Sequence, residues 1–408
     1  MRPVPDLPDE LALERLRQAH ELSAEAVVRT PVLSAGSVSA RLGAPVALKA
    51  ENLQRTGSFK LRGALHKLRS SPGAAGVVAG SAGNHAQSLA YAARTFGLPC
   101  EVFMPVDGSV GKMEAVRAFG AEVHAEGESV DECIELARAR AAETGLLFVH
   151  PFDDLEVIAG QAGVGLELLE EGPEPGLVVV PIGGGGLISG VAAAIRQSRP
   201  GTRIVGVQAE RCSPFPESVA AGAAVSAESV ATIADGIAVK RPGEVTLQLV
   251  EELVDEIVTV SESAIAAAMA LLLERSKLVV EGAGAASLAA VTAGEVELDP
   301  ERDNVVVLSG GNVDVGLLAT IAARQETLQG RRLRLFTKVS DRPGSLAALL
   351  ATVAAAKANL ITVEHVRESA QLDVRETGVV LTLETRGEGH AAEVRAALVA
   401  AGYEIAEV

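Results

Sequence analysis

The segment that decides how this chain folds and acts reads Thr56-Gly57-Ser58-Phe59-Lys60-Leu61-Arg62-Gly63-Ala64. A Gly-Ser turn leads here into a helical pattern, so we expect Lys60 in the first turn of a helix. The positive end of the helix macrodipole disfavours an ammonium group and lowers the lysine pKa, which favours attack of the amine on a carbonyl. When the segment is considered alone, an ordinary solvated helix lysine explains it at least as well.

A second segment of small residues, Gly80-Ser81-Ala82-Gly83-Asn84-His85-Ala86-Gln87, follows a strand-like run at residues 77–80. Small residues let backbone N–H groups approach a ligand, and a helix N-terminus attracts an anion. A carboxylate therefore fits this loop. Considered singly, His85 is explained equally well as a capped histidine of the core.

The third segment, Gly183-Gly184-Gly185-Gly186-Leu187, also follows a strand. Four successive glycines present a row of unobstructed N–H donors, which suits a phosphate. No Gly-Lys-Ser/Thr follows, so this is not a Walker A loop. Gly184, Gly186 and Ser189 match the dinucleotide pattern incompletely, and Glu210 lies near the end of the next strand. A nicotinamide enzyme is therefore an alternative.

The fourth segment, Ser309-Gly310-Gly311-Asn312, ends another strand-like run. A hydroxyl at the carboxyl end of a strand can point into the sheet crevice and hydrogen-bond a ring nitrogen. A plain turn from strand to helix explains this segment equally well when it is considered alone.

Strand-like and helical patterns alternate through the long N-terminal part of the chain. Short, mostly β-branched runs occupy residues 77–80, 177–182, 203–207 and 304–308, and helical spacing of apolar residues occupies 129–143 and 262–275. This alternation predicts an α/β fold, with parallel sheets covered by helices on both faces.

The pattern changes after a polar stretch at residues 324–332. A β-α-β-β-α-β order is expected at residues 333–339, 345–357, 360–367, 378–385, 389–401 and 403–408. This order predicts a separate, small α+β domain at the C-terminus.

The composition excludes several classes of protein. The chain has 408 residues and a net charge of −17, which repels nucleic acid and anionic membrane surfaces. Residues 1–14 are acidic and mixed, without a basic region followed by an apolar run, so we expect no signal peptide there. No apolar run approaches the ~20 residues of a membrane span. The cysteines at positions 100, 133 and 212 have no metal or redox spacing. We expect a cytoplasmic protein with reduced thiols and without nucleic-acid or membrane partners.

Together and in this order, the four segments resemble the fold-type II pyridoxal-phosphate enzymes, and specifically the threonine dehydratases. The resemblance covers about residues 30–323, and the segment Asp341-Arg342-Pro343-Gly344-Ser345-Leu346 makes the tail similar to an ACT regulatory domain. A catalytic domain followed by one ACT module is similar to the medium-length threonine ammonia-lyases.

This resemblance implies a tryptophan synthase β-like catalytic domain at residues 1–325 with two open-sheet subdomains. The small subdomain would span 54–149, and the large one would combine 1–53 with 150–325. A linker at 326–332 would lead to a ferredoxin-like ACT domain at 333–408.

The resemblance also implies the roles of single residues. Lys60 would carry pyridoxal 5'-phosphate as an imine, with Phe59 against the ring and Asn84 at its 3'-oxygen. Ser309 would face the ring nitrogen. The phosphate would bind to Gly183, Gly184, Gly185, Gly186 and Leu187. The substrate carboxylate would bind to Ser81, Gly83, Asn84 and His85, and the pocket would also be lined by Gly236 and Glu281.

Two residue choices indicate the reaction. Ser309 cannot hold a pyridinium proton as a carboxylate would, and the resulting weaker electron sink suits β-elimination. In the similar serine racemases a serine protonates the substrate face opposite the lysine, where this chain has Ala82. The resemblance thus implies conversion of L-threonine to 2-oxobutanoate and ammonia, with action on L-serine as well, as a first step toward isoleucine. The alternatives are a serine or 3-hydroxyaspartate dehydratase, a racemase, a nicotinamide-dependent oxidoreductase, and a non-catalytic amino-acid-binding regulator.

The ACT-like tail implies regulation and assembly. Isoleucine or valine is the expected effector, contacting the loop of residues 341–346 and Asn359, with a plain turn as the alternative reading of the loop. Paired ACT domains imply a homodimer or homotetramer. Some relatives bind a divalent cation directly after the strand that ends here near Val207. In this chain Gln208 substitutes poorly for a carboxylate ligand, and the direction of the Glu210 side chain cannot be assigned. Whether the protein binds a metal ion is therefore left open.

Overall fold

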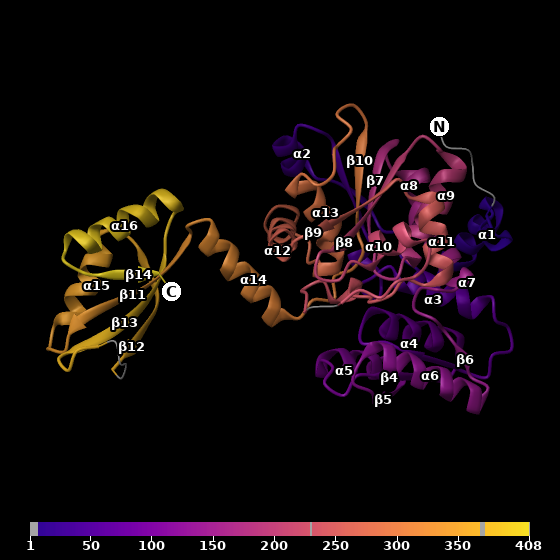
Figure 1. Ribbon diagram of the computed structural model, residues 1–408, viewed down its shortest axis with the longest axis horizontal. Coiled ribbons are helices and arrows are strands. Elements are labelled where there is room, and N and C mark those ends of the chain that lie inside the picture. The colour runs from indigo at the N-terminus through magenta and orange to yellow at the C-terminus, as the bar shows by residue number, and fades with distance from the viewer. Residues whose placement is uncertain (1–6, 229–230, 368–371, 408) are drawn as a thin grey trace. The chain divides into compact units, whose positions relative to one another are not determined.

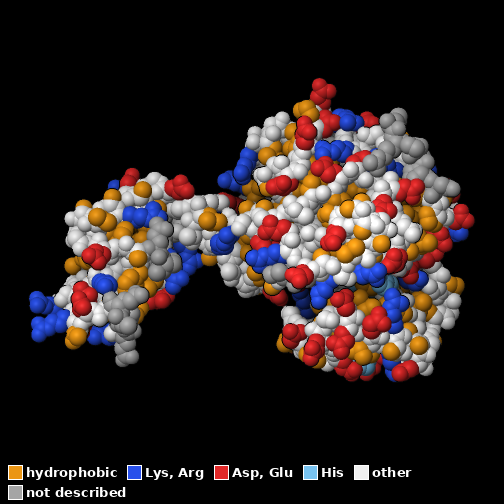
Figure 2. Space-filling view, in the orientation of Figure 1, with side chains coloured by type: hydrophobic (Ala, Val, Ile, Leu, Met, Phe, Trp, Pro, Cys, Tyr) orange, Lys and Arg blue, Asp and Glu red, His pale blue; other side chains and the backbone are white. Residues whose placement is uncertain are grey.

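The computed structural model describes residues 7–228, 231–367 and 372–407. It divides into two compact units, Met1–Val313 and Asp314–Val408 (Figure 1). Within the described ranges, no helix is both long enough and apolar enough to cross a membrane. On the face of the molecule in Figure 2, acidic and basic side chains are interspersed over the surface.

The larger unit contains a six-stranded sheet in the order β1-β2-β10-β7-β8-β9. Its strands are β1 (Val32–Ser34), β2 (Val46–Ala50), β7 (Pro175–Pro181), β8 (Arg203–Ala209), β9 (Glu256–Val260) and β10 (Asp303–Leu308). β1 is antiparallel to β2, and the other neighbours are parallel. The central strands are buried along nearly their whole length, which is why they read as continuous apolar runs rather than alternating ones.

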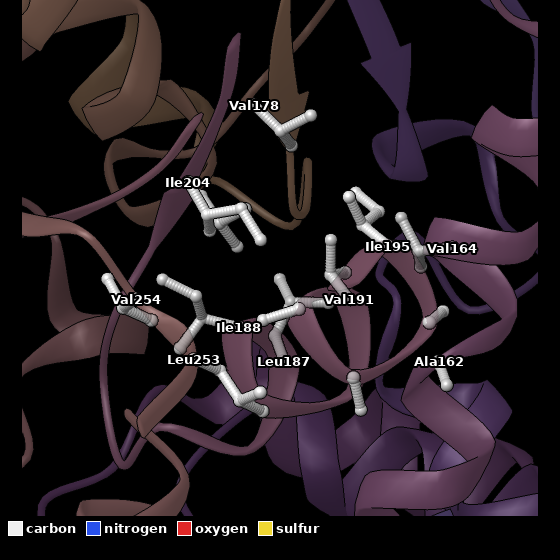
Figure 3. Close-up of a cluster of buried hydrophobic side chains, with 14 of the residues drawn as sticks. Ala162, Val164, Val178, Leu187, Ile188, Val191, Ile195, Ile204, Leu253 and Val254 are labelled. Atoms are coloured by element: carbon white, nitrogen blue, oxygen red, sulfur yellow. The ribbon is translucent and has the colours of Figure 1, made fainter. Parts of the chain in front are cut away.

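Helices cover both faces of this sheet, as the alternating pattern predicts. One face packs on α9 (Gly186–Ser198), whose Leu187, Ile188, Val191 and Ile195 meet Val178 and Ile204 of the strands (Figure 3). The same face carries α7 (Leu155–Gln161), α8 (Gly163–Glu171) and α11 (Glu244–Leu253). The opposite face packs on α13 (Gly282–Ala293), with α12 (Glu262–Leu271) beside it. The remaining helices of this part are α1 (Leu13–Ser23), α2 (Gly36–Leu42) and α10 (Pro214–Ala221).

A second sheet in the same unit has the order β5-β4-β3-β6, and all its strands are parallel. They are β3 (Val77–Gly80), β4 (Cys100–Met104), β5 (Glu122–Ala125) and β6 (Leu147–Phe148). Alternate residues face opposite sides: Val77 packs with α3 (Lys60–Arg69) and α4 (Asn84–Phe96), whereas Val78 packs with α6 (Val130–Thr144). α5 (Val110–Ala118) completes this part of the unit.

A buried ionic cluster joins helix α3 to the larger sheet. Arg62 donates to both carboxylate oxygens of Glu51 at 2.8 Å and to those of Glu167 at 2.7 and 2.8 Å. Lys49 on β2 donates to Glu167 at 2.5 Å and to the carbonyl of Thr30 at 2.6 Å. The two cations and two carboxylates are essentially inaccessible to water, and their formal charges cancel. The first turns of α3 are therefore fixed by charge-assisted hydrogen bonds as well as by apolar packing.

The C-terminal unit begins with α14 (Val315–Leu328) and contains a four-stranded antiparallel sheet in the order β12-β13-β11-β14. Its elements are β11 (Arg332–Ser340), α15 (Ser345–Ala355), β12 (Asn359–Val366), β13 (Glu376–Glu384), α16 (Glu388–Ala400) and β14 (Ile405–Glu407). The predicted β-α-β-β-α-β order and its ferredoxin-like class are confirmed. Val408, which the prediction included in the last strand, lies outside the described residues.

Two predicted segments differ from the structure in kind. The helix expected at 262–275 is α-helical only to Leu271; a π-helical turn, Leu272–Ser276, follows and ends at Lys277, whose φ is 59°. The apolar spacing continues through this turn, so periodicity in the sequence cannot distinguish the α-helix from the π-helical turn. The linker expected at 326–332 is not a free segment, because α14 extends to Leu328 on good helix formers and β11 already begins at Arg332. The contacts also place α14 with the C-terminal unit, so that the division between units falls at 313/314 rather than 325/326.

Candidate active site

The larger unit has two parts, one built on the six-stranded sheet and one built on the sheet of β3 to β6. A cavity of about 370 Å³ is lined by residues of both parts. It brings together every residue that was predicted to bind cofactor or substrate: Phe59, Lys60, Ser81, Gly83, Asn84, His85, Gly183, Gly184, Gly185, Gly186, Leu187, Gly236, Glu281 and Ser309. The carboxyl ends of β3, β7 and β10 all open toward it, as is typical of parallel α/β sheets.

Lys60 is the first residue of α3, as predicted, and Phe59 is the N-cap. Its Nζ donates to the carbonyl of Pro151 at 2.6 Å and lies 5.2 Å from the centroid of the Phe59 ring. Loss of hydration lowers the pKa of Lys60 to about 8, although the nearby carboxyl of Glu281 opposes the shift. About a tenth of the Lys60 amine is therefore neutral at pH 7, far more than for an ordinary lysine.

Asn84, at the start of α4, is held from two sides. Its Nδ2 donates to Glu281 at 2.7 Å, and its Oδ1 accepts from Asn312 at 2.8 Å. Asn312 also donates to the carbonyl of Thr56 at 2.8 Å, and so ties the fourth sequence segment to the first. Burial, with a contribution from Asp235, raises the pKa of Glu281 to about 7. The role of Asn312 was not predicted, although the Ser309–Asn312 motif contained it.

The side chain of His85 is turned into the fold. Its Nε2 lies 3.0 Å from the carbonyl oxygen of Val149, and burial lowers its pKa to about 3. A neutral imidazole that donates from Nε2 leaves Nδ1 as an acceptor, which cannot donate to a carboxylate. The free N–H groups of the first turn of α4 can still do so. The sequence suggested both a substrate contact and a core histidine, and the side-chain geometry favours the second.

The glycine run forms a close-fitting loop before α9. A Cβ on Gly184 would lie 2.3 Å from Cγ of Phe152, and one on Gly186 would lie 2.9 Å from the Phe152 carbonyl oxygen. Gly185 has a φ of 95°, which a residue with a side chain rarely adopts. The loop leads into the N-terminus of α9, so the geometry and the dipole both suit a phosphate.

The segment of residues 150–154 supports both the lysine and the glycine loop. Pro151 accepts from Lys60, and Phe152 packs against Gly184 and Gly186. Asp153 accepts the N–H groups of residues 244, 245 and 246 at 3.1–3.2 Å and so caps helix α11. These contacts join segments far apart in the sequence, and no local motif signals them.

The residues present fit one cofactor. A partly buried lysine of lowered pKa, a glycine loop at a helix N-terminus, and Ser309 directly after β10 line the same cavity. Residues 24–311 match the family described as pyridoxal-phosphate dependent enzymes. This chain belongs to that family.

A curated relative matches this pyridoxal-phosphate dependent enzyme over nearly its whole length. It is 45% identical to an L-threonine ammonia-lyase of Geobacter sulfurreducens over 391 residues, which is 95% of this chain and 97% of that protein. The solved structure of a threonine deaminase from T.th. is 43% identical, with a TM-score of 0.71 over 74% of this chain and 99% of that one. The maize serine racemase structure is 35% identical, with a TM-score of 0.72 over 78% and 98%.

In this pyridoxal-phosphate dependent enzyme the side chain of Gln208 is engaged within the fold and does not point outward as a cation ligand. Its Oε1 accepts the N–H of Phe215 at 3.0 Å and its Nε2 donates to the carbonyl of Ile182 at 3.4 Å, so both ends of the amide serve the fold. Glu210 is exposed. The family assignment also excludes the nicotinamide interpretation of the loop at 184–189.

Replacing Gly184 with Ala should weaken binding of pyridoxal 5'-phosphate. The added Cβ would lie 2.3 Å from Phe152, so that either the loop or the ring must move. We expect the dissociation constant to rise about tenfold or more, which corresponds to ~1.4 kcal/mol. The measurement is a titration of the apoprotein followed by fluorescence. Gly201→Ala is the matched control, because no atom lies within 4 Å of a Cβ added there. Equal cofactor affinities for the two variants would contradict the assignment of the loop.

Attachment of the cofactor to the apoprotein should depend on pH through Lys60, because only a neutral amine attacks a carbonyl. The Lys60 pKa is lowered to about 8, so the rate should rise with pH below that value and level off above it. Removal of the Glu281 charge by Glu281→Gln should lower the midpoint further, because this carboxyl raises the Lys60 pKa. Stopped-flow absorption in the visible range measures the rate. A rate still rising at about pH 10, as expected of an ordinary lysine, would contradict the prediction.

Proposed function

We propose that this protein is an L-threonine ammonia-lyase that forms 2-oxobutanoate and ammonia and also acts on L-serine. The observation that carries the proposal is the placement of Lys60, with its lowered pKa, in one cavity with the glycine loop and Ser309. The Geobacter relative supports the choice of substrate, because it matches over almost the full length of both chains.

Phe59, Lys60, Asn84, the loop of residues 183–187 and Ser309 would hold the cofactor. Bound pyridoxal 5'-phosphate supplies an electron-withdrawing ring that stabilises negative charge at the α-carbon of an amino acid. Ser309 offers a neutral hydroxyl at the position where a carboxylate would keep the ring nitrogen protonated. We therefore assign the enzyme to elimination rather than to transamination.

Lys60 is the base in this proposal. Its Nζ removes the proton from the α-carbon of the substrate, and the lowered pKa makes the neutral amine available for this transfer. The Pro151 carbonyl accepts a hydrogen bond from Nζ and so orients the amine. The N–H groups at the start of α4, together with Ser81 and Gly83, bind the substrate carboxylate.

Ala82 is the residue that distinguishes the proposed elimination from racemisation. It lines the cavity within the carboxylate loop and carries no exchangeable proton. A racemase needs an acid on the face of the substrate opposite the lysine, so similarity to the maize racemase is here a similarity of scaffold. Ala82→Ser should introduce racemisation of L-serine if this distinction is correct.

The test compares 2-oxo acid formation from L-threonine, L-serine and L-threo-3-hydroxyaspartate by the purified, cofactor-loaded protein. Preference for threonine supports the proposal. Turnover dominated by serine or hydroxyaspartate retains the lyase reaction and changes the substrate. Failure of all three substrates would refute the lyase assignment.

We also propose that the C-terminal unit is an ACT-like regulatory domain that binds isoleucine or valine. The loop of residues 341–346 follows β11 at the end where Ser340 pairs with Glu376, whereas Asn359 pairs with Glu384 at the opposite end of β13. One small effector that touches both must therefore lie between two copies, which supports a homodimer or homotetramer. Unchanged threonine kinetics in the presence of each amino acid would refute this regulation.

The cytoplasm is the compartment that we propose. Cys100, Cys133 and Cys212 are buried thiols that form no disulfide with one another, as is usual in reducing compartments. Fractionation of the native cells, with the protein found outside the soluble cytoplasmic fraction, would contradict this.

A further inference from the structure

An ion pair spans the cavity between the two parts of the larger unit. Nζ of Lys112, on α5, lies 2.6 Å from Oδ2 of Asp235, in the short helix Asp235–Ile237. Both residues line the cavity. α5 belongs to the part built on β3 to β6, whereas the Asp235 segment packs beside α13 of the other part. The pair therefore closes one side of the cavity with opposite charges.

The pair lies beside the groups that hold the reaction centre. Gly236 follows Asp235, and a Cβ there would lie 3.7 Å from Oε1 of Glu281 and 4.0 Å from Nδ2 of Asn84. Lys112 is 19% exposed and Asp235 is 59% exposed, and both side chains belong to the lining of the cavity.

The pair affects the binding of a substrate that carries a second carboxylate. While Lys112 is bound to Asp235, its charge is compensated, and a β-carboxylate must displace the aspartate to reach it. Glu281, which is close by, adds further negative charge when ionised. A substrate with a neutral β-substituent, such as threonine, meets neither obstacle.

We propose that the Lys112–Asp235 pair is a specificity determinant that admits 3-hydroxy amino acids with uncharged side chains and rejects dicarboxylic ones. This inference rests on the proposed ammonia-lyase function and names the residues that select its substrate class. Removal of the Asp235 charge lets Lys112 attract a second carboxylate. Removal of the Lys112 charge leaves Asp235 to repel it.

The experiment measures kcat/KM for L-threonine and for L-threo-3-hydroxyaspartate, with the cofactor-loaded protein. In Asp235→Asn the ratio of hydroxyaspartate to threonine should rise about tenfold over wild type, and in Lys112→Gln it should fall by a similar factor. L-aspartate as a competitive inhibitor of threonine turnover gives a second readout: its inhibition constant should fall in Asp235→Asn and rise in Lys112→Gln.

Glu256→Gln is the matched control, because it also removes one surface carboxylate from an ion pair, with Arg203 at 2.5 Å, but lies outside the cavity lining. It should leave both ratios unchanged. An unchanged ratio and an unchanged aspartate inhibition constant in Asp235→Asn would overturn the inference. Shifts in the same direction in both charge-removing variants would also overturn it, because that pattern indicates general loosening of the cavity. Failure of the proposed function is separate, since it appears as absence of threonine turnover in the wild-type protein.

Discussion

Lys60→Ala should lower kcat/KM for L-threonine by at least about 10³-fold, because the substitution removes both the covalent anchor of the cofactor and the proposed base. The structure gives a physical reason for choosing this lysine. Its Nζ lies in the cavity against the Pro151 carbonyl, and its pKa is lowered to about 8. Steady-state formation of 2-oxo acid measures the loss of activity. Loss of the visible absorption of the lysine-bound cofactor provides a second, independent readout.

Lys67→Ala is the matched control for this prediction. Lys67 lies on the same helix but pairs with Asp154 at 2.6 Å and does not line the cavity. Its removal should leave the visible absorption intact and change turnover by no more than a fewfold factor. Wild-type turnover in Lys60→Ala, or equal losses in the two variants, would refute the assignment of Lys60.

Much of the larger unit could be predicted from sequence, because its signals are local. Buried parallel strands such as β7 and β10 need continuous apolar runs, and the glycine loop needs residues without side chains. The position of Lys60 at a helix start follows in the same way from the turn before it. Each of these features is determined within about ten residues of chain.

The contacts that orient the site could not be predicted, because each joins distant segments. Pro151 is 91 residues from Lys60, and Asn312 is 228 residues from Asn84. The side-chain direction of His85 is also a tertiary property, because it depends on the carbonyl of Val149 on a neighbouring segment. Sequence indicates which residue types gather in the cavity, but not which hydrogen bonds they form.

Arg62→Met should lower the free energy of unfolding by about 3–5 kcal/mol, because it leaves two buried carboxylates facing one remaining cation. In the native protein Arg62 bonds to both Glu51 and Glu167, and all three side chains are at most 2% exposed. Methionine retains most of the buried apolar volume, so the loss measures the charge imbalance rather than a cavity. Urea unfolding of the cofactor-loaded protein, followed by circular dichroism, gives the difference.

Arg203→Met is the control, since it removes an arginine from a surface pair with Glu256, in which the side chains are 37% and 43% exposed. That loss should be only about 0–1 kcal/mol, because water and salt screen exposed pairs. Arg62 is two residues from Lys60 on α3, so Arg62→Met should in addition weaken cofactor attachment, whereas Arg203→Met should not. Equal destabilisation by the two substitutions would mean that neighbouring groups or water compensate the buried charges, and that apolar packing alone fixes the start of α3.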